Sequence, residues 1–219
     1  MARRRILLIH ATPVAVEPVH QAFIELWPEA EPFDLLDATL SVDRAAAEAL
    51  TGDLTERLCL LAAYAEQRAG AEAVLFTCSA FGPAIEEAAR RTRIPVLKPN
   101  QAMFEAALQQ GGRVGLLATF EPSISSMAAE FEEMRQAAAA ETDLVTRVVP
   151  DAMTRLRAGD AEAHNRLVAE AAGALADCDS VMLAQFSTSR ARAATEAQLG
   201  RPVLTAPHAA VAALRSRLG

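Results

Sequence analysis

The stretch AVLFTCSAFGP, residues 73–83, is the part of the sequence from which a fold is most readily inferred. Four apolar residues lead into a threonine, a cysteine and several small residues, and Pro83 closes the stretch. A short, continuous apolar run indicates a strand buried on both faces of a parallel sheet, and proline is favoured in the first turn of a helix. The stretch therefore predicts a buried strand, a tight turn at Cys78 and a helix that begins near Pro83.

The same pattern recurs 107 residues later in the chain. Residues 181–183 precede Gln185 as residues 74–76 precede Cys78. Further matches share this offset: Thr12 with Thr119, Gly52-Asp53 with Gly159-Asp160, and residues 94–97 with residues 201–204. Several matches at one offset and in one order predict a duplicated unit, in which Gln185 occupies the position of Cys78.

Four apolar runs predict parallel strands, and Ala-rich helical stretches separate them. The strands are expected at residues 6–9, 73–76, 114–117 and 180–183. The helices are expected at 16–26, 42–49, 54–68 and 83–91, then at 103–109, 123–140, 161–176, 188–199 and 209–218. Each duplicated unit is expected to run in the order strand, helix, second strand, loop, helix, third strand, turn and helix. The fold class is therefore α/β, with two pseudo-symmetric lobes, each a parallel sheet flanked by helices.

The lobes are expected to comprise residues 1–98 with 206–219, and residues 99–205. The chain would cross near Pro99, and the last helix would pack back on the first lobe. Ligands of open parallel sheets bind beyond the carboxyl ends of the strands. We therefore expect an active-site cleft between the two lobes, lined by the residues that follow the strands.

Composition narrows the partners that this chain could have. Of 219 residues, 52% are hydrophobic but only 5% aromatic, which favours a core of Ala, Leu and Val. A net charge of -7 disfavours nucleic acid as a partner. The sequence shows neither a signal peptide nor an apolar run of roughly 20 residues, the length of a membrane helix. The basic cluster Arg3-Arg4-Arg5 is expected to be the solvated start of the first strand.

The three cysteines do not predict a disulfide framework. Their number is odd and their spacing wide, so we expect a cytoplasmic location. Cys59 lies in an apolar helical run and is expected in the core, and Cys178, between two aspartates, is expected to be structural. The sequence contains no CxxC, HExxH, GxGxxG or P-loop motif, so neither a metal nor a nucleotide cofactor is expected.

Cys78 is the strongest candidate for chemistry. A helix start beside it would favour the thiolate, which can transfer a proton or attack carbon. The alternative is that Cys78 is a small buried filler, as many free cysteines are. Thr12 and Thr119, after the first strand of each lobe, could bind substrate oxygens or cap the helices that follow. Ser187 and Thr188 could likewise cap a helix or contact an anion.

The four histidines are weaker candidates. His10 is placed near Thr12 and would be either a buried, hydrogen-bonded core histidine or a site residue. His208, expected at the start of the last helix after Pro207, could rim the cleft. His20 and His164 lie within predicted helices and are expected at the surface.

These residues resemble a known family. The duplicated lobes, Thr12, the turn Thr77-Cys78-Ser79 and the segment 183–187 are similar to the aspartate/glutamate/hydantoin racemase superfamily, which also contains arylmalonate decarboxylases and maleate isomerases. The resemblance covers nearly the whole chain. It implies a cofactor-independent enzyme whose racemase members use one cysteine from each lobe. It also implies that Cys78 is the first cysteine and that Ser79 and Ala80 hold the substrate's carboxylate.

The second cysteine position of the family falls on Gln185, where this sequence departs from the racemase pattern. A glutamine amide forms hydrogen bonds but does not titrate, so a two-base proton exchange lacks its second base. One thiol suffices to protonate the carbanion left by loss of carbon dioxide, or to isomerise a substrate through a covalent adduct. Arylmalonate decarboxylases have their single cysteine in the second lobe, so protonation here is expected from the opposite face.

The resemblance therefore implies an enzyme that acts on a small carboxylate, with Cys78 as acid, base or nucleophile. Thr12, Ser79, Thr119, Gln185 and Ser187 would bind the substrate's oxygens. The alternative is a carboxylate-binding or regulatory protein that has lost catalysis. A nucleotide-dependent enzyme would need a Gly-rich phosphate loop, which is not present. An Ala-rich helix face would support a homo-oligomer.

Overall fold

The computed structural model describes residues 4–219, apart from the side chain of residue 122. Arg3, part of the predicted basic start, lies outside the described residues. The chain divides into two compact units: residues up to Pro99 together with Ala210–Gly219, and Asn100–Ala209. Each unit is described by itself below.

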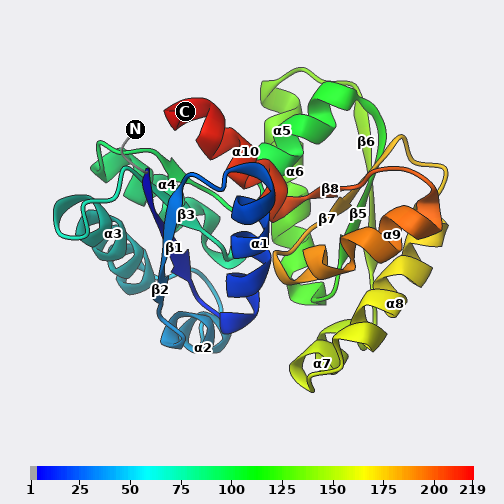
Figure 1. Ribbon diagram of the computed structural model, residues 1–219, viewed down its shortest axis with the longest axis horizontal. Helices are drawn as coiled ribbons and strands as arrows, with labels where there is room; N and C mark the ends of the chain where they lie inside the picture. Colours follow the sequence, from blue (N-terminus) through cyan, green and yellow to red (C-terminus); the bar gives the residue numbers. More distant parts are fainter. Residues whose placement is uncertain (1–3) are drawn as a thin grey trace. The chain divides into compact units, whose positions relative to one another are not determined.

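The first unit is a parallel sheet of four strands in the order β2-β1-β3-β4. The strands are β1 (Arg5–His10), β2 (Glu31–Leu36), β3 (Ala73–Phe76) and β4 (Val96–Leu97). The helices are α1 (Val16–Leu26), α2 (Thr39–Ala46), α3 (Gly52–Gln67) and α4 (Gly82–Arg91). Figure 1 shows α3 and α4 on one side of this sheet and α1 on the other.

The core of the first unit lies between its sheet and the helices α3 and α4. Alternate residues of β1 and β3 pack against small and branched side chains of the two helices: Leu7, Ile9, Val74 and Phe76 against Leu58, Ala62, Ala84 and Ile85. Full burial of each large apolar side chain stabilises the fold by about 1.5–3 kcal/mol. Alanines at the helix contacts let the helices approach the sheet closely. The core is therefore built mainly from Ala, Leu and Val, as the low aromatic content predicted.

The second unit repeats this arrangement with the strand order β6-β5-β7-β8. Its strands are β5 (Gly112–Ala118), β6 (Thr142–Val148), β7 (Ser180–Leu183) and β8 (Leu204–Thr205). Its helices are α5 (Gln101–Gln110), α6 (Ile124–Ala137), α7 (Ala152–Arg157), α8 (Ala161–Ala172) and α9 (Arg192–Leu199), and α10 (Ala206–Leu218) follows. The predicted α/β class, the duplicated sheets and the four predicted strands are confirmed.

Strand pairing shows that the repeat slips by one residue in its first strand. Phe76 pairs with Ile9, whereas Leu183, 107 residues after Phe76, pairs with Leu117, 108 residues after Ile9. Thr119 is therefore the structural counterpart of Ala11, and the predicted match of Thr12 with Thr119 is wrong by one position. Cys78 and Gln185 stay matched, because each lies two residues beyond the paired residue of its strand.

Several bounds differ from those inferred from the sequence. The second strands, β2 and β6, lie at the edges of their sheets and are partly exposed, so they lack a continuous apolar run. Residues Ser187–Ala191 form a 3-10 turn before α9, where a helix from residue 188 was predicted. The last helix begins at Ala206, before Pro207, rather than at residue 209. Proline is accepted there because the first turn of a helix needs no amide donor.

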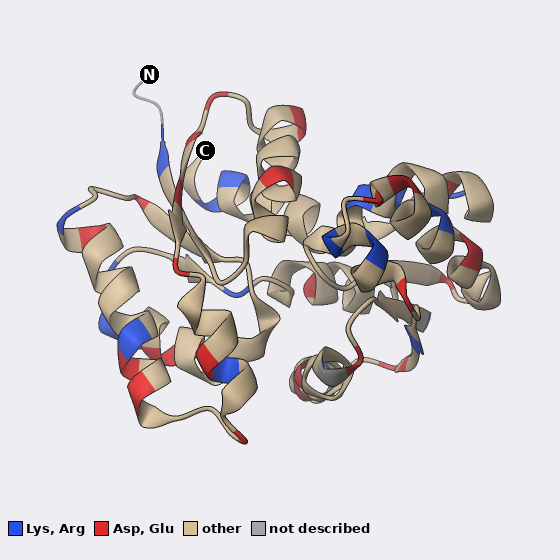
Figure 2. Ribbon diagram, turned by 90° about the horizontal axis from the view of Figure 1, so that it is seen from below, with Lys and Arg blue, Asp and Glu red and all other residues tan. Residues whose placement is uncertain are grey.

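Charged residues lie mixed along the outer helices of each unit, as Figure 2 shows. Several pairs stand one helical turn apart, such as Arg91 with Glu87 at 2.6 Å and Arg192 with Glu196 at 3.1 Å. Arg4, in the predicted basic cluster, is exposed and pairs with Glu72 at 2.6 Å. Between residues 4 and 219, no helix is both long and apolar enough to cross a membrane.

Gly115 in β5 provides a test of the packing in the second unit. A Cβ atom there would lie 2.8 Å from Cδ1 and 3.2 Å from Cβ of Leu175. We expect Gly115→Ala to lower the free energy of unfolding by about 1–3 kcal/mol, because the added methyl group overfills the space. Urea denaturation measures the change. Gly52→Ala is the matched control, since nothing lies within 4 Å of its Cβ position. An equal loss of stability in both variants would contradict the packing seen at Gly115.

Candidate active site

Cys78 lies at the carboxyl end of β3, on a turn that passes into α4. Thr77 follows the strand, and Ser79–Phe81 form a single 3-10 turn before α4 begins at Gly82. Cys78 as a whole residue is partly buried. The side chain of Cys78 forms no capping hydrogen bond, but the backbone N–H of Ala80 and the guanidinium of Arg44 lie near enough to act on the charge of the sulfur. The turn thus brings one amide and one positive charge to a single thiol.

Burial dominates the electrostatics of Cys78. Desolvation of the sulfur raises the pKa of the Cys78 thiol, and the Ala80 N–H and the Arg44 charge oppose this only in part. The amide of the turn favours the thiolate, but burial of the sulfur outweighs it. A 3-10 turn of three residues lies between Cys78 and the first residue of α4. Cys78 is a neutral thiol at neutral pH.

Arg44 is a residue that the sequence did not single out. It comes from α2, where its Nε donates to the carbonyl of Ala80 at 3.2 Å and its Nη1 donates to the carbonyl of Ala47 at 3.1 Å. It therefore holds the Cys78 turn against the end of α2. No sequence pattern identifies it, because it lies 36 residues from Ala80 and belongs to a helix whose predicted bounds were shifted.

His10 is completely buried at the end of β1, with both ring nitrogens hydrogen-bonded. Its Nδ1 lies 2.8 Å from Oγ1 of Thr77, and its Nε2 lies 2.9 Å from Oδ1 of Asp34. Burial lowers the pKa of His10, although the Asp34 carboxylate opposes the shift. The imidazole is therefore neutral near pH 7, and the expectation of a buried, hydrogen-bonded histidine is met.

The other predicted residues of the first unit lie at the same edge of the sheet, because β1 and β3 are adjacent and parallel. Thr12 is partly buried, and its side chain forms no capping hydrogen bond with the 3-10 turn Pro13–Ala15 that follows. Ser79 and Ala80 are partly buried within the Cys78 turn. The hydroxyl of Thr12 is therefore not used as a helix cap.

In the second unit, the side chain of Gln185 forms the centre of a hydrogen-bond network. Its Oε1 accepts from the backbone N–H of Thr119 at 2.8 Å, from Oγ1 of Thr119 at 3.0 Å and from Oγ1 of Thr188 at 3.1 Å. Its Nε2 donates to Oγ of Ser123 at 2.9 Å. The amide thus joins the segment after β5 to the segment after β7, and Thr119 bonds to Gln185 rather than to a helix end.

Ser187 and His208 occupy the remaining predicted positions of the second unit. Ser187 is buried as the first residue of the 3-10 turn Ser187–Ala191, so it is not the residue that precedes the turn. His208 is partly exposed in the first turn of α10, where its Nδ1 lies 2.6 Å from Oγ1 of Thr205. Whether the predicted residues of the two units line one cleft stays a prediction.

The structure corrects one expectation about the remaining histidines. His164 is completely buried on the inner side of α8 rather than at the surface, and burial lowers its pKa. Its Nδ1 bonds to Oδ1 of Asn165 at 2.8 Å. His20 is partly exposed and lies 2.9 Å from Asp34. Cys59 and Cys178 are buried, as expected.

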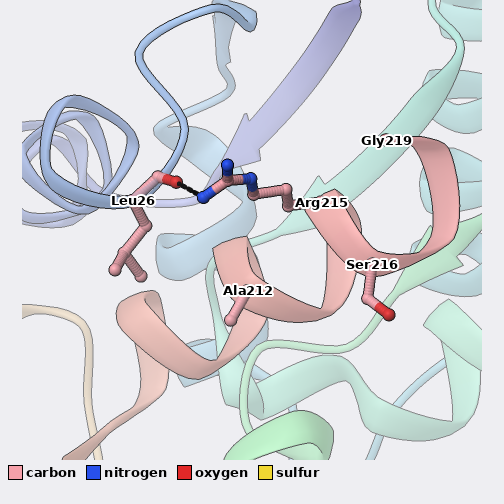
Figure 3. Close-up of a pocket in the computed structure, with 5 residues that line it drawn as sticks. All are labelled: Leu26, Ala212, Arg215, Ser216 and Gly219. Atoms are coloured by element: carbon pink, nitrogen blue, oxygen red, sulfur yellow. Dashed lines mark hydrogen bonds between the residues drawn. The ribbon is translucent and has the colours of Figure 1, made fainter.

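No residue of the Cys78 turn lines the cavity of about 450 Å³ that is shown in Figure 3. It is lined by Leu26, Ala212, Arg215, Ser216 and Gly219. The Arg215 guanidinium donates a hydrogen bond to the carbonyl of Leu26 at 2.7 Å, and this bond connects α10 to the end of α1. Across residues 4–219, no group of three or more His, Cys, Asp or Glu side chains is placed to hold a metal ion.

A comparison of the chain with known protein families finds one match. The model of the Asp/Glu/Hydantoin racemase family matches residues 6–214. The chain belongs to this family. No curated protein sequence matches it significantly.

Solved structures of racemases and of a decarboxylase share the fold. Aspartate racemase from Picrophilus torridus superposes with a TM-score of 0.73 at 15% identity, over 98% of this chain and 94% of that chain. Glutamate racemase from Francisella tularensis, in complex with D-glutamate, gives 0.72 at 14% identity, over 100% and 82%. A glycine-to-cysteine mutant of arylmalonate decarboxylase, associated with sulfate, gives 0.67 at 19% identity, over 98% and 94%. At these identities the likeness establishes the fold alone.

The Gln185 network generates a prediction about stability. We expect Gln185→Ala to lower the free energy of unfolding by about 1–3 kcal/mol, because the backbone N–H of Thr119 loses its acceptor and is left unsatisfied. Urea denaturation measures this. Gln21→Ala is the control, because the Gln21 side chain donates to Glu25 on the exposed side of α1. Equal stability of the two variants would contradict a structural role for the Gln185 amide.

The buried histidines predict a loss of stability in acid. The folded state holds the pKa of His10 and of His164 below the ordinary value, so the unfolded chain binds protons more readily. Stability should be fully present above the unfolded pKa of about 6.5 and should fall as the pH drops toward the folded pKa values. Unfolding monitored from about pH 7 to about pH 5, a range that spares most carboxylates, measures the slope. The slope should be smaller in His164→Gln; an unchanged slope would exclude His164 as a contributor.

Proposed function

We propose that this chain is a cofactor-independent enzyme that acts on a small carboxylate, with Cys78 as its single proton donor. Membership of the racemase family supports the substrate class, as do the racemases and the decarboxylase that share its fold. The observation that carries the proposal is the identity and bonding of Gln185. At the strand end that matches Cys78, the chain has an amide that is bound to Thr119, Thr188 and Ser123 and cannot act as a second base.

The chemistry that fits one neutral thiol is protonation of a carbanion. In decarboxylation of a substituted malonate, the bond between the α-carbon and one carboxylate breaks and carbon dioxide leaves. The electron pair stays on the α-carbon and is delocalised into the remaining carboxylate. The Cys78 S–H then donates its proton to that carbon, and the thiolate that remains takes a proton from water. A thiol whose pKa is raised by burial is already protonated at neutral pH, as this step requires.

The residues around Cys78 are suited to bind the remaining carboxylate. Ser79 and Ala80 lie in the turn, and the Thr12 hydroxyl, which caps no helix, lies at the same sheet edge. Arg44 brings a positive charge to the turn. Hydrogen-bond donors directed at a carboxylate that gains charge in the transition state lower the barrier to the reaction.

The predicted residues of the second unit are proposed to bind substrate oxygens as well. The amide nitrogen of Gln185 carries two N–H groups, of which one goes to Ser123; the other has no partner among the described residues. It can donate to a substrate oxygen while the network around Oε1 stays intact. Thr119 and Ser187 are the further candidates on this side.

A second candidate function is carboxylate binding without chemistry. The raised pKa of Cys78 favours it over nucleophilic catalysis, because a thiol attacks carbon poorly. Isomerisation through a covalent adduct needs the thiolate and is disfavoured for the same reason. The two remaining candidates differ in one respect: the enzyme requires the Cys78 proton, whereas the binding protein does not.

The test offers aryl- and alkyl-substituted malonates and α-amino acids to the protein in deuterated water. We expect malonates to lose carbon dioxide and to take up one deuterium on one face. The Cys78→Ala variant should lose activity by about 10²–10⁴-fold, the usual contribution of a general acid. The Cys59→Ala variant is the control, since Cys59 is buried in α3, and it should keep the activity. The rate should fall as the pH rises through the raised Cys78 pKa, because a thiolate cannot donate.

Other outcomes would identify the alternatives. Exchange of the α-proton of both enantiomers of an amino acid would show a two-base racemase and contradict the proposal. A rate that increases with pH would indicate that Cys78 acts as nucleophile or base. Binding of a carboxylate without turnover, retained in Cys78→Ala, would favour the binding protein. Product of the same handedness as that of arylmalonate decarboxylase would contradict protonation from the opposite face.

A further inference from the structure

Four side chains of the first unit form a continuous hydrogen-bonded chain that ends beside Cys78. Thr77 follows β3, His10 ends β1, Asp34 lies in β2 and His20 lies in α1. The Thr77 Oγ1 is 2.8 Å from Nδ1 of His10, whose Nε2 is 2.9 Å from Oδ1 of Asp34. The same carboxylate is 2.9 Å from Nε2 of His20. The chain thus crosses three neighbouring strands, from the Cys78 turn to a partly exposed histidine.

The hydrogen positions in this chain follow from the chemistry of its members. A carboxylate only accepts, so Nε2 of His10 carries a hydrogen and donates to Asp34. Neutral His10 then has its lone pair on Nδ1, and the Thr77 hydroxyl donates to it. The competing acceptor of that hydroxyl, the carbonyl of Ile9, is farther away at 3.4 Å. Asp34 therefore selects the tautomer of His10, and His10 orients Thr77.

Burial of the polar side chains in this chain costs free energy, which an apolar residue at position 10 would avoid. The neighbouring residues of β1 on the same face, Ile6 and Leu8, are completely buried and apolar, so an apolar residue would fit the pattern at position 10. A buried imidazole must instead have both nitrogens satisfied. One of these partners connects His10 to the proposed site. Thr77, whose hydroxyl bonds to His10, is the residue directly before Cys78.

The Thr77 peptide is held from two directions. Its backbone N–H donates to the carbonyl of Ile9 at 3.0 Å, which extends the pairing of β3 with β1 by one residue. Its hydroxyl is held by His10. On the other side of Cys78, Arg44 holds the carbonyl of Ala80. The sulfur therefore lies between two anchored residues, and its position depends on both anchors.

We propose that His10 is a positioning residue, oriented by Asp34, that holds the Cys78 turn in its working geometry through the Thr77 hydroxyl. This inference rests on the proposed function, because it assigns His10 a part in the same site. His10 does not touch the reacting atoms and acts only through Thr77. The titratable groups that act on His10 are Asp34 on β2 and His20 on α1.

The reactivity of Cys78 toward a small neutral alkylating agent tests the inference without any substrate. Mass spectrometry assigns the reaction to Cys78 across a range of pH. Thr77→Val removes the hydroxyl at nearly constant shape, and Thr77→Ser keeps it. His10→Gln keeps an amide near the position of Nε2 and loses the bond to Thr77. His10→Asn keeps an amide near the position of Nδ1 and retains that bond.

Loss of the Thr77 bond should let the turn relax and admit water to the sulfur. Because burial is the largest cause of the raised Cys78 pKa, the midpoint of alkylation should then fall toward that of an ordinary thiol. A fall of one pH unit means about tenfold faster alkylation at a fixed pH below the midpoint. We expect this in Thr77→Val and His10→Gln, with no further change in the double variant. Thr77→Ser and His10→Asn should stay within about twofold of the parent protein.

His164→Gln is the matched control, because it removes a second buried histidine that belongs to the other unit. It should lower stability without altering Cys78. Equal reactivity of Thr77→Val and Thr77→Ser, or of His10→Gln and His10→Asn, would overturn the inference. So would a change in His164→Gln as large as that in His10→Gln. If a His10 variant fails to fold, the Thr77 pair decides alone.

The outcomes separate this inference from the proposed function. If the variants change Cys78 reactivity as expected but no carboxylate is converted, the positioning role stands and the proposed function fails. If carboxylates are converted and Cys78 reactivity is the same in all variants, the function stands and the positioning role fails. Where activity is present, Thr77→Val should lower kcat more than it changes KM, because a displaced thiol impairs proton transfer and not binding.

Discussion

The pairing of the first strand with the third in each sheet is the constraint on which the candidate site depends. Thr77 donates its N–H to Ile9 at 3.0 Å, and Ala184 donates to Leu117 at 2.9 Å. These two hydrogen bonds extend the parallel ladders past the ends of β3 and β7. As a result, His10 lies within hydrogen-bond distance of Thr77, which is 67 positions away in sequence. Thr119 likewise bonds to Gln185, which is 66 positions away. Parallel strands end at the same edge, so side chains that follow them must meet.

The two units use this shared edge differently. In the first unit it holds a thiol beside a backbone amide, and a buried histidine and an arginine hold the flanking residues. In the second unit the matching position holds an amide whose oxygen accepts three hydrogen bonds. A group that accepts from the backbone and two hydroxyls stabilises the loops around it but exchanges no proton. The two matched positions therefore carry one titratable group, Cys78, and one amide that does not titrate, Gln185.

Burial outweighs the helix start at Cys78 because of the local backbone. A 3-10 turn of three residues lies between the sulfur and the first residue of α4. The field of a helix falls off within its first turn, so a single amide and one guanidinium remain to oppose desolvation. The outcome is a thiol that stays protonated at neutral pH, which is the state that the proposed proton donation requires.

Local patterns in the sequence were sufficient for the four central strands, most helices and the duplication. Continuous apolar runs identify buried strands because both faces of these strands are covered. The edge strands β2 and β6 were not located, because partly exposed strands lack such runs. The burial of His164 was also missed, because the many alanines of its helix do not show which helix face is turned to the core.

By itself the sequence determined the α/β class, the repeat, the match of Cys78 with Gln185 and the family, because these depend on residue type and spacing along the chain. Tertiary structure alone decided the one-residue slip of the first strand, the position of Arg44, the contacts of His10 with Thr77 and Asp34, and the protonation state of Cys78. Each of these depends on hydrogen bonds and burial between segments far apart in the chain. Such contacts and the solvation they remove are properties of the packed fold, which no local pattern records.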